Sequence, residues 1–446
     1  MPIKNSDQCE LCHKKSLECV WTKTTIGKNQ EDSFDRFRQE EQIYSTVVAR
    51  NYANSQQYVC STHPIASFLS TDKFLCFDGD SFGLFNPWTN TQTIESSEDS
   101  NPDLTDYLRS QGAFVLPPIT EQRELMQVFM DRIYLFFPVI EETDKLEEMP
   151  LLLLNAIFLA ATRLTNPQSR DRCQQLFERC KLLELVENNK VVLIQSFLLM
   201  SIHEEGISGS SLSKEYITRA CNLCGDIGLT TLSGSNGTVE DTQHRVYKKM
   251  YYGKSLLTRI FWVSYFCDRL SAATHARDMY YNMADVLIEE VSPEYDGLRV
   301  IVELATFIDR ILCAHYRPPQ GRSIDDKLHN DLLTWKTSIN HQWVKLLYSY
   351  ICILFLRCKL DPVTLDESVP KSLFEHLSKI LKIDKVWFRF HVVGIHGLLH
   401  VTSLLHLLDE IQQQDIKHHA VELLELLKDN WWLAAAGLKL FQQNDK

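Results

Sequence analysis

Three cysteines near the N-terminus have the spacing of metal ligands. Cys9, Cys12 and Cys19 form a C-x2-C-x6-C pattern. Thiolates spaced in this way can bind one Zn²⁺ ion in tetrahedral geometry, with the third closing from a following turn. A single zinc ion takes four ligands, and the nearest further candidate, His13, directly follows Cys12, so that joint coordination is strained. The sequence therefore predicts a zinc site at Cys9, Cys12 and Cys19 that these residues alone leave incomplete.

The same cysteines allow other interpretations. Cys12 followed by His13 completes a C-x2-C-H pattern, which is that of c-type haem attachment. Haem attachment needs an exported or organellar setting, and nothing in the sequence supplies one. A second alternative leaves the three thiols unligated in a disordered N-terminus. A third completes the zinc site by dimerisation or by sequence upstream of Met1, and the spacing alone leaves these alternatives open.

Two further clusters have metal-ligand or redox spacing. Cys221 and Cys224 lie in an apolar periodic stretch without a second C-x2-C, which favours packing in the core. His396 and His400 are separated by Gly-Leu-Leu, without the carboxylate of a metal-binding H-E-x-x-H, so a half-buried histidine face is favoured. No nucleophile stands beside a general base. We therefore predict that the chain is not an enzyme and has no catalytic residues.

Composition limits how the chain can meet nucleic acid or a membrane. The 446 residues carry a formal net charge of −12, so any contact with DNA must come from a local patch such as the mildly basic residues 1–30. The 13 cysteines without an apolar leader are typical of reduced thiols in the nucleus or cytosol. The apolar run Leu346–Leu356 is shorter than the roughly 20 residues that a bilayer needs. We expect it to form a buried helix, and we expect no membrane partner.

Apolar residues recur at helical spacing from residue 113 onward. The polar and turn-rich residues 23–112 predict a linker, partly disordered, between a partial zinc-cluster segment at 1–22 and a helical domain at 113–446. Pro150–Leu164 is apolar nearly all round, which is typical of a helix at the centre of a large domain. The predicted fold class is all-α, with helices near 120–137, 150–164, 168–186, 190–204, 212–227, 253–272, 298–316, 323–358, 367–384, 390–413 and 416–441.

The N-terminal cysteine segment resembles one half of a known motif. Residues 8–21, QCELCHKKSLECVW, look like the second half of the fungal binuclear zinc cluster, in which six cysteines hold two zinc ions. The first half, which carries the basic residues that contact bases and phosphates in that family, is absent because the chain starts eight residues before Cys9. The resemblance implies zinc as a cofactor in an incomplete site. It also implies weak sequence-specific DNA binding by this chain.

The helical region, over about 110–440, resembles the fungal-specific transcription factor regulatory domain. Its most specific block runs from Arg259 to Arg269, RIFWVSYFCDR, and is similar to that family's Arg-x-Phe-Trp-x-x-Tyr-x-x-Asp-Arg signature. Trp262, Tyr265 and Phe266 are expected to face a core. A buried pair such as Asp268 and Arg269 is structural more often than catalytic, because pairing makes buried charge tolerable. The family's Gly-Arg-Pro after this helix is replaced here by Ala-Arg-Asp at 276–278.

The two resemblances together imply a function. They imply a nuclear regulator of genes transcribed by RNA polymerase II, acting as a homodimer or as a heterodimer with other zinc-cluster factors. They also imply a small-molecule effector bound between helices. The alternative is a partner protein that does not bind DNA and that regulates intact zinc-cluster factors through its helical domain.

Overall fold

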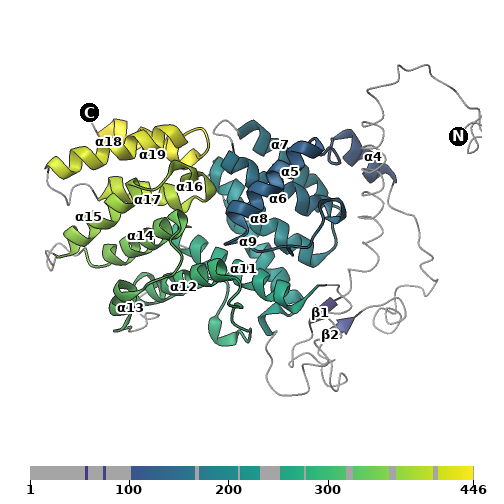
Figure 1. Ribbon diagram of the computed structural model, residues 1–446, viewed down its shortest axis with the longest axis horizontal. Coiled ribbons are helices and arrows are strands. Elements are labelled where there is room, and N and C mark those ends of the chain that lie inside the picture. Colours follow the sequence, from purple (N-terminus) through teal and green to yellow (C-terminus); the bar gives the residue numbers. More distant parts are fainter. Residues whose placement is uncertain are drawn as a thin grey trace, which may run out of the picture. The chain divides into compact units, whose positions relative to one another are not determined.

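The segments with helical periodicity form packed α-helices in the computed structural model of the chain (Figure 1). The chain divides into two compact units, Met1–Tyr44 and Ser45–Lys446. All described residues belong to the second unit, and they are 56–58, 74–76, 102–165, 170–208, 211–231, 252–275, 278–317, 325–360, 368–404 and 410–444. In this part of the chain the predicted all-α fold class is confirmed.

The apolar stretch Pro150–Leu164 lies at the centre of the first group of helices. Helix α6 (Leu151–Thr165) is buried on all sides from Leu151 to Leu164, as predicted. Two of its buried polar residues bond within the helix, since Asn155 donates to the Leu151 carbonyl oxygen and Thr162 to that of Phe158. Helix α6 is contacted by α5 (Ile119–Val128), α7 (Arg170–Glu184) and α8 (Lys190–Ser208), and α9 (Ser211–Asp226) packs against α8.

Helix α11 (Lys254–His275) joins this first group to the second. It contacts α8 and α9 on one side and α12 (Asp296–Ile311) on the other. The remaining helices continue from α12 to the end of the chain, and their bounds are α13 (Leu328–Thr334), α14 (Gln342–Arg357), α15 (Ser368–Leu381), α16 (Lys385–Phe390), α17 (Val393–Ser403), α18 (Glu410–Leu427) and α19 (Trp432–Asn444).

Helix α14 is the centre of this second group. It contacts α12, α15 and α17. Within it every residue of the apolar run Leu346–Leu356 is buried except Tyr348, which is half-buried. The prediction of a buried helix at this run is therefore confirmed. No described helix is long and apolar enough to cross a membrane.

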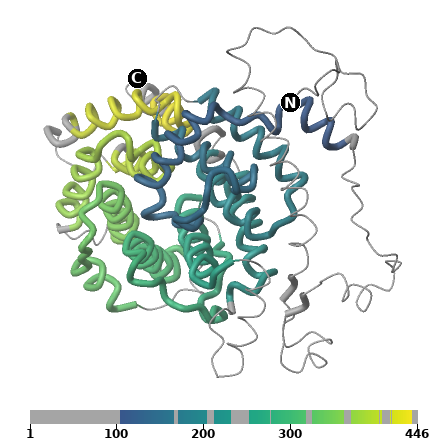
Figure 2. Tube along the Cα trace, turned by 45° about the vertical axis from the view of Figure 1, so that its right-hand side comes forward, coloured from purple at the N-terminus to yellow at the C-terminus, as the bar shows by residue number. Residues whose placement is uncertain are grey.

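The end of the chain returns to the first group of helices. Helix α16 contacts α6 and helix α19 contacts α8, and both views show the yellow α19 beside the blue helices of the first group (Figures 1 and 2). Trp431, just before α19, is fully buried, and its indole nitrogen donates to the Phe388 carbonyl oxygen at 2.8 Å. The C-terminal helices therefore share a core with α6 and α8 of the first group.

Several predicted boundaries are wrong. The predicted helix at 323–358 is two helices, α13 and α14, because the chain turns at 335–341 and His341 caps α14 by accepting the N–H of Trp343. The predicted helices at 390–413 and 416–441 are instead α17, α18 and α19, and Asp384 caps a separate short helix, α16. Helix α8 continues to Ser208, past the predicted end near 204. Apolar periodicity runs through these turns, so it did not reveal them.

Some described elements lie in the segment predicted as a linker. They are helix α4 (Pro102–Ser110) and the three-residue strands β1 (Gln56–Tyr58) and β2 (Phe74–Cys76), which pair antiparallel with Gln57 opposite Leu75. Short turns complete the domain: the 3-10 helices Leu146–Glu148, Leu229–Thr231 and Met283–Asp285, and the π-helical turns Phe129–Ile133 and Leu312–Tyr316.

Candidate functional site

Helix α11 carries the signature block and buries it almost completely. Tyr265 and Phe266 are buried as predicted, whereas Trp262 is half-buried and its indole nitrogen donates to the Glu289 carbonyl oxygen at 2.8 Å. Two arginines, Arg259 and Arg269, are among the largest fully buried side chains of the described region, each 1% exposed. Charges that deep need partners, and each arginine has several.

Arg259 holds the turn that follows α5. Its Nη1 donates to the carbonyl oxygens of Pro138 and Ile140, both at 3.0 Å, and to the Tyr134 hydroxyl at 3.1 Å. Its Nη2 lies 2.5 Å from the carboxylate of Glu141. Because the planar guanidinium can donate in several directions at once, one side chain ties the Phe-Pro-Val-Ile turn to α11.

Asp268 and Arg269 hold the segment that follows α11. The Asp268 carboxylate accepts the backbone N–H groups of Tyr280 at 2.9 Å and Tyr281 at 3.2 Å. Arg269 pairs with Asp268, donates to the Tyr281 carbonyl oxygen at 2.7 Å, and has its Nε 2.9 Å from the Asp309 carboxylate. Burial raises the pKa of the Asp268 carboxyl, while these hydrogen bonds act against that shift. The predicted structural role of the pair is confirmed, since its bonds go to the protein's own backbone and neighbours.

The other clusters of the sequence are part of the core. Cys221 and Cys224 are fully buried, and the Cys224 thiol lies 3.7 Å from the Ser264 hydroxyl, which confirms their predicted packing role. His396 and His400 are half-buried as predicted, and His400 stacks on the ring of Tyr350. In the described ranges no three His, Cys, Asp or Glu side chains gather as a metal site.

The predicted zinc ligands Cys9, Cys12 and Cys19 lie outside the described residues. The zinc site therefore stays a prediction from the sequence. The replacement of the family motif at 276–278 is likewise not described, because residues 276 and 277 lie outside the described residues.

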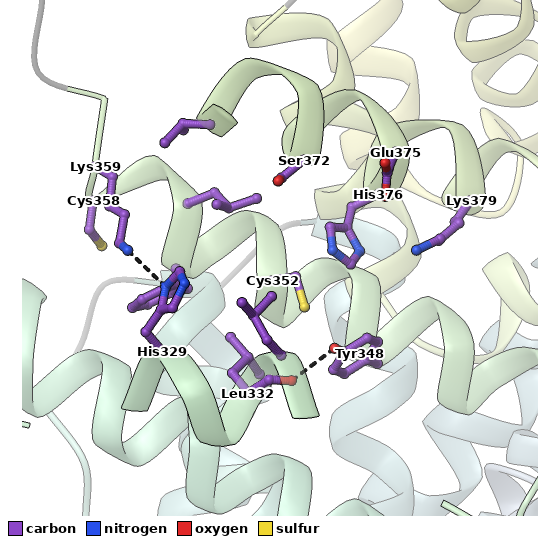
Figure 3. A pocket seen from close by; sticks show the side chains of 14 residues that line it. His329, Leu332, Tyr348, Cys352, Cys358, Lys359, Ser372, Glu375, His376 and Lys379 are labelled. Atoms are coloured by element: carbon purple, nitrogen blue, oxygen red, sulfur yellow. Dashed lines mark hydrogen bonds between the residues drawn. The ribbon is translucent and has the colours of Figure 1, made fainter. Parts of the chain in front are cut away.

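A cavity that the sequence did not suggest opens between α13, α14 and α15 (Figure 3). Its volume is about 900 Å³. Helix α13 contributes His329 and Leu332 to its lining, and α15 contributes Ser372, His376 and Lys379. The sequence did not predict the cavity because α13 and α14 were expected to form one continuous helix. A cavity enclosed by three helices needs α13 to be separate from α14. The recurrence of Ser372, His376 and Lys379 on one helical face is the signal that could have drawn attention to it.

The described residues thus form an all-α domain with a buried arginine network and an open cavity between helices. Residues 126–297 match the sequence profile of the "Fungal specific transcription factor domain". The matched range runs from within α5 to the start of α12 and includes the whole signature helix.

Two curated proteins are similar to the chain. Cutinase transcription factor 1 alpha from Fusarium vanettenii is 25% identical over 304 residues, which cover 56% of this chain and 32% of that protein. Transcription factor cpaR from Aspergillus oryzae is 27% identical over 298 residues, which cover 52% of this chain and 48% of that protein. The similarity thus spans about a third of one relative and about half of the other.

Proposed function

We propose that this chain is a transcription regulator that acts in the nucleus on genes transcribed by RNA polymerase II. The match of residues 126–297 to the fungal specific transcription factor domain carries the proposal, because it includes the helix whose Arg259 and Arg269 organise the fold. The names of the two relatives, both transcription factors, support it. In this proposal the helical domain is the regulatory module.

The direct test is to tether the full chain to a reporter gene. The chain is fused to a heterologous DNA-binding domain in a fungal host, and we expect reporter expression to change several-fold relative to that DNA-binding domain alone. Arg259→Ala removes the contacts that hold the turn after α5 and should abolish the change. Arg299→Ala removes only an exposed pair with Asp296 and should preserve it. Unchanged expression with a folded, nuclear fusion would contradict the proposal.

We propose further that Cys9, Cys12 and Cys19 bind zinc as part of a site completed by a ligand outside these three. Thiolates are zinc's preferred soft ligands, and the C-x2-C spacing suits tetrahedral geometry. Metal analysis of the purified full chain should find zinc at no more than one ion per chain. The triple variant Cys9→Ser, Cys12→Ser, Cys19→Ser should lose it, whereas Cys313→Ser, in the helical domain, should not. Zinc that survives the triple variant would place the metal elsewhere.

DNA binding by this chain is proposed to be weak. The segment 1–22 holds three of the six cysteines that a binuclear cluster uses, and the chain as a whole is acidic. A mobility-shift assay on paired CGG half-sites should show little retention, and any retention should fall steeply with salt. A tight and sequence-specific shift by the full chain would overturn this part of the proposal.

The second candidate function follows from the same three cysteines. A chain that keeps the helical domain but binds DNA poorly can act as a homodimer or as a heterodimer that regulates an intact zinc-cluster factor. Co-purification with such a factor, together with reporter activity that depends on the partner's zinc cluster, would favour this function. Reporter activity in a host that lacks the partner would favour the first.

A further inference from the structure

We propose that the cavity between α13, α14 and α15 binds an amphipathic organic carboxylate, with its carboxylate on the polar face of α15 and its apolar body against α14. The binding site stands on its own geometry. Only its use as an effector site in gene regulation rests on the proposed function.

The wall formed by α13 and α14 is apolar. Leu332, Cys352 and Phe355 line it, and each is nearly enclosed by the surrounding protein. The hydroxyl of Tyr348, on the same wall, donates to the Leu332 carbonyl oxygen at 2.9 Å, as Figure 3 shows. Because the protein itself engages that hydroxyl, this wall offers a ligand mainly apolar surface.

The opposite wall, on α15, is polar. Ser372, His376 and Lys379 recur at four- and three-residue spacing, so they share one face of the helix. His376 is 7% exposed, and among the described residues its buried Nδ1 has no hydrogen-bond partner. Buried polar atoms in native proteins are nearly always paired, so an unpaired nitrogen beside a cavity suggests a group that is bound there.

The chemistry of this wall suits a carboxylate. Burial lowers the pKa of His376 to about 4, with Lys379 acting in the same direction, so the imidazole is neutral near pH 7. A neutral imidazole has one N–H to donate, a serine hydroxyl has another donor, and the lysine ammonium supplies the charge. A carboxylate accepts all three, and bonds to a charged group are the stronger ones.

The charges around the cavity also favour an anion. In the described part of the chain neither Lys359 nor Lys379 makes an ion pair with a carboxylate. Lys359, at the opposite end in Figure 3, is held by the protein, since it donates to His329 at 2.8 Å and lies 4.7 Å from the Phe355 ring centre. Among the described lining residues the only carboxylate is Glu375, which is exposed. Lys379 is therefore the cation that remains for a ligand.

The size of the cavity fits a small molecule with a substantial body. A volume of about 900 Å³ lies within the range of small-molecule sites, roughly 300–1,000 Å³. Inorganic phosphate would satisfy the polar wall but leave the apolar wall without a partner. An uncharged alcohol would contact the apolar wall but would offer no negative charge to Lys379. Inorganic phosphate and an alcohol are therefore the two control ligands.

The test measures binding to the purified full chain by titration calorimetry. The probes are octanoate and phenylbutyrate, each compared with the alcohol of the same carbon skeleton and with inorganic phosphate. We expect each acid to bind about tenfold more tightly than its alcohol, and phosphate to bind more weakly than either acid. Lys379→Met should remove most of the preference for the acid. Lys371→Met, an exposed lysine of the same helix outside the cavity, should leave it intact.

Each outcome decides one claim. Equal binding of acid and alcohol, or an acid preference that survives Lys379→Met, overturns the carboxylate site. Equal losses in Lys379→Met and Lys371→Met overturn its location. If the acids bind as expected but leave the tethered reporter unchanged, the site stands and its role as an effector site fails. If the tethered chain has no reporter activity at all, the proposed function fails whatever the calorimetry shows.

Discussion

The guanidinium Nε of Arg269 lies 2.9 Å from the carboxylate of Asp309, so a buried ion pair joins α11 to α12. The same guanidinium pairs with Asp268, its neighbour in sequence. The side chain of Asp268 is 7% exposed and that of Asp309 is 24% exposed. One buried cation thus has two carboxylate partners that differ in their access to water, and this difference can be measured.

Asp268→Ala should destabilise the domain severely. The change removes the acceptor for the Tyr280 and Tyr281 N–H groups and leaves Arg269 with a single carboxylate. We expect the free energy of unfolding to fall by about 3–5 kcal/mol, because an uncompensated buried charge is costly. Asp309→Ala should cost clearly less, since water can reach that position. Urea unfolding followed by circular dichroism measures both, and equal losses would contradict the role given to Asp268.

Two glycine-to-alanine changes should shift the free energy of unfolding in opposite directions. A Cβ at Gly297 would lie 2.1 Å from the carbonyl oxygen of Leu135, which is too close for any real contact. Gly297→Ala should therefore lower the free energy of unfolding by about 1–3 kcal/mol or more. Gly225 lies in α9 with nothing within 4 Å of its added Cβ, so Gly225→Ala should raise it by about 0.5–1 kcal/mol. Thermal unfolding of the two variants checks the pair, and a stable Gly297→Ala would mean that α12 sits further from Leu135.

The domain should lose stability as the pH falls below about 6.5. Burial lowers the pKa of His391 to about 3 and that of His376 to about 4, and it holds that of His203 well below 6.5. Between 6.5 and these values the unfolded chain binds more protons than the folded one. Each such histidine then reduces the free energy of unfolding by about 1.4 kcal/mol per pH unit. The raised pKa values of three carboxyls, Asp144, Glu184 and Asp268, act in the opposite direction, but the histidines with a lowered pKa outnumber them.

Unfolding in urea at about pH 7.5 and about pH 5.5 measures this loss. His391→Asn keeps a side-chain acceptor for the Val393 N–H but removes the titrating group. It should therefore flatten the pH dependence without a large cost near neutrality. A variant with the same slope as the unaltered chain would show that His391 does not stay neutral in the fold.

Cys221 and Cys224 should resist alkylation in the folded chain. Both are fully buried, and burial raises the pKa of the Cys224 thiol to about 11 and that of Cys221 well above its usual range. Because the thiolate is the reactive form, iodoacetamide at about pH 8 should modify them at least about tenfold more slowly than the half-buried Cys313. Peptide mass spectrometry measures the rates, and the difference should vanish in urea. Comparable rates in the folded chain would revive a redox or metal role for this C-x2-C pair.

The sequence by itself determined the fold class and the identity of the central helix. Helix α6 is apolar all round, so only burial on every side could satisfy it, and a local pattern was enough to predict that. The same holds for the structural role of Asp268 and Arg269, because adjacent opposite charges in an apolar helix have few other uses.

The tertiary structure decided which groups those charges meet. Asp268 bonds to the backbone of Tyr280 and Tyr281, and Arg259 to that of Pro138 and Ile140, and no local pattern links residues so far apart in the chain. It also decided the cavity. Helical periodicity continued across the turn at 335–341, so the separation of α13 from α14 became visible only in the folded chain. Periodicity reports which face of a helix is buried, whereas the partner of that face depends on the whole chain.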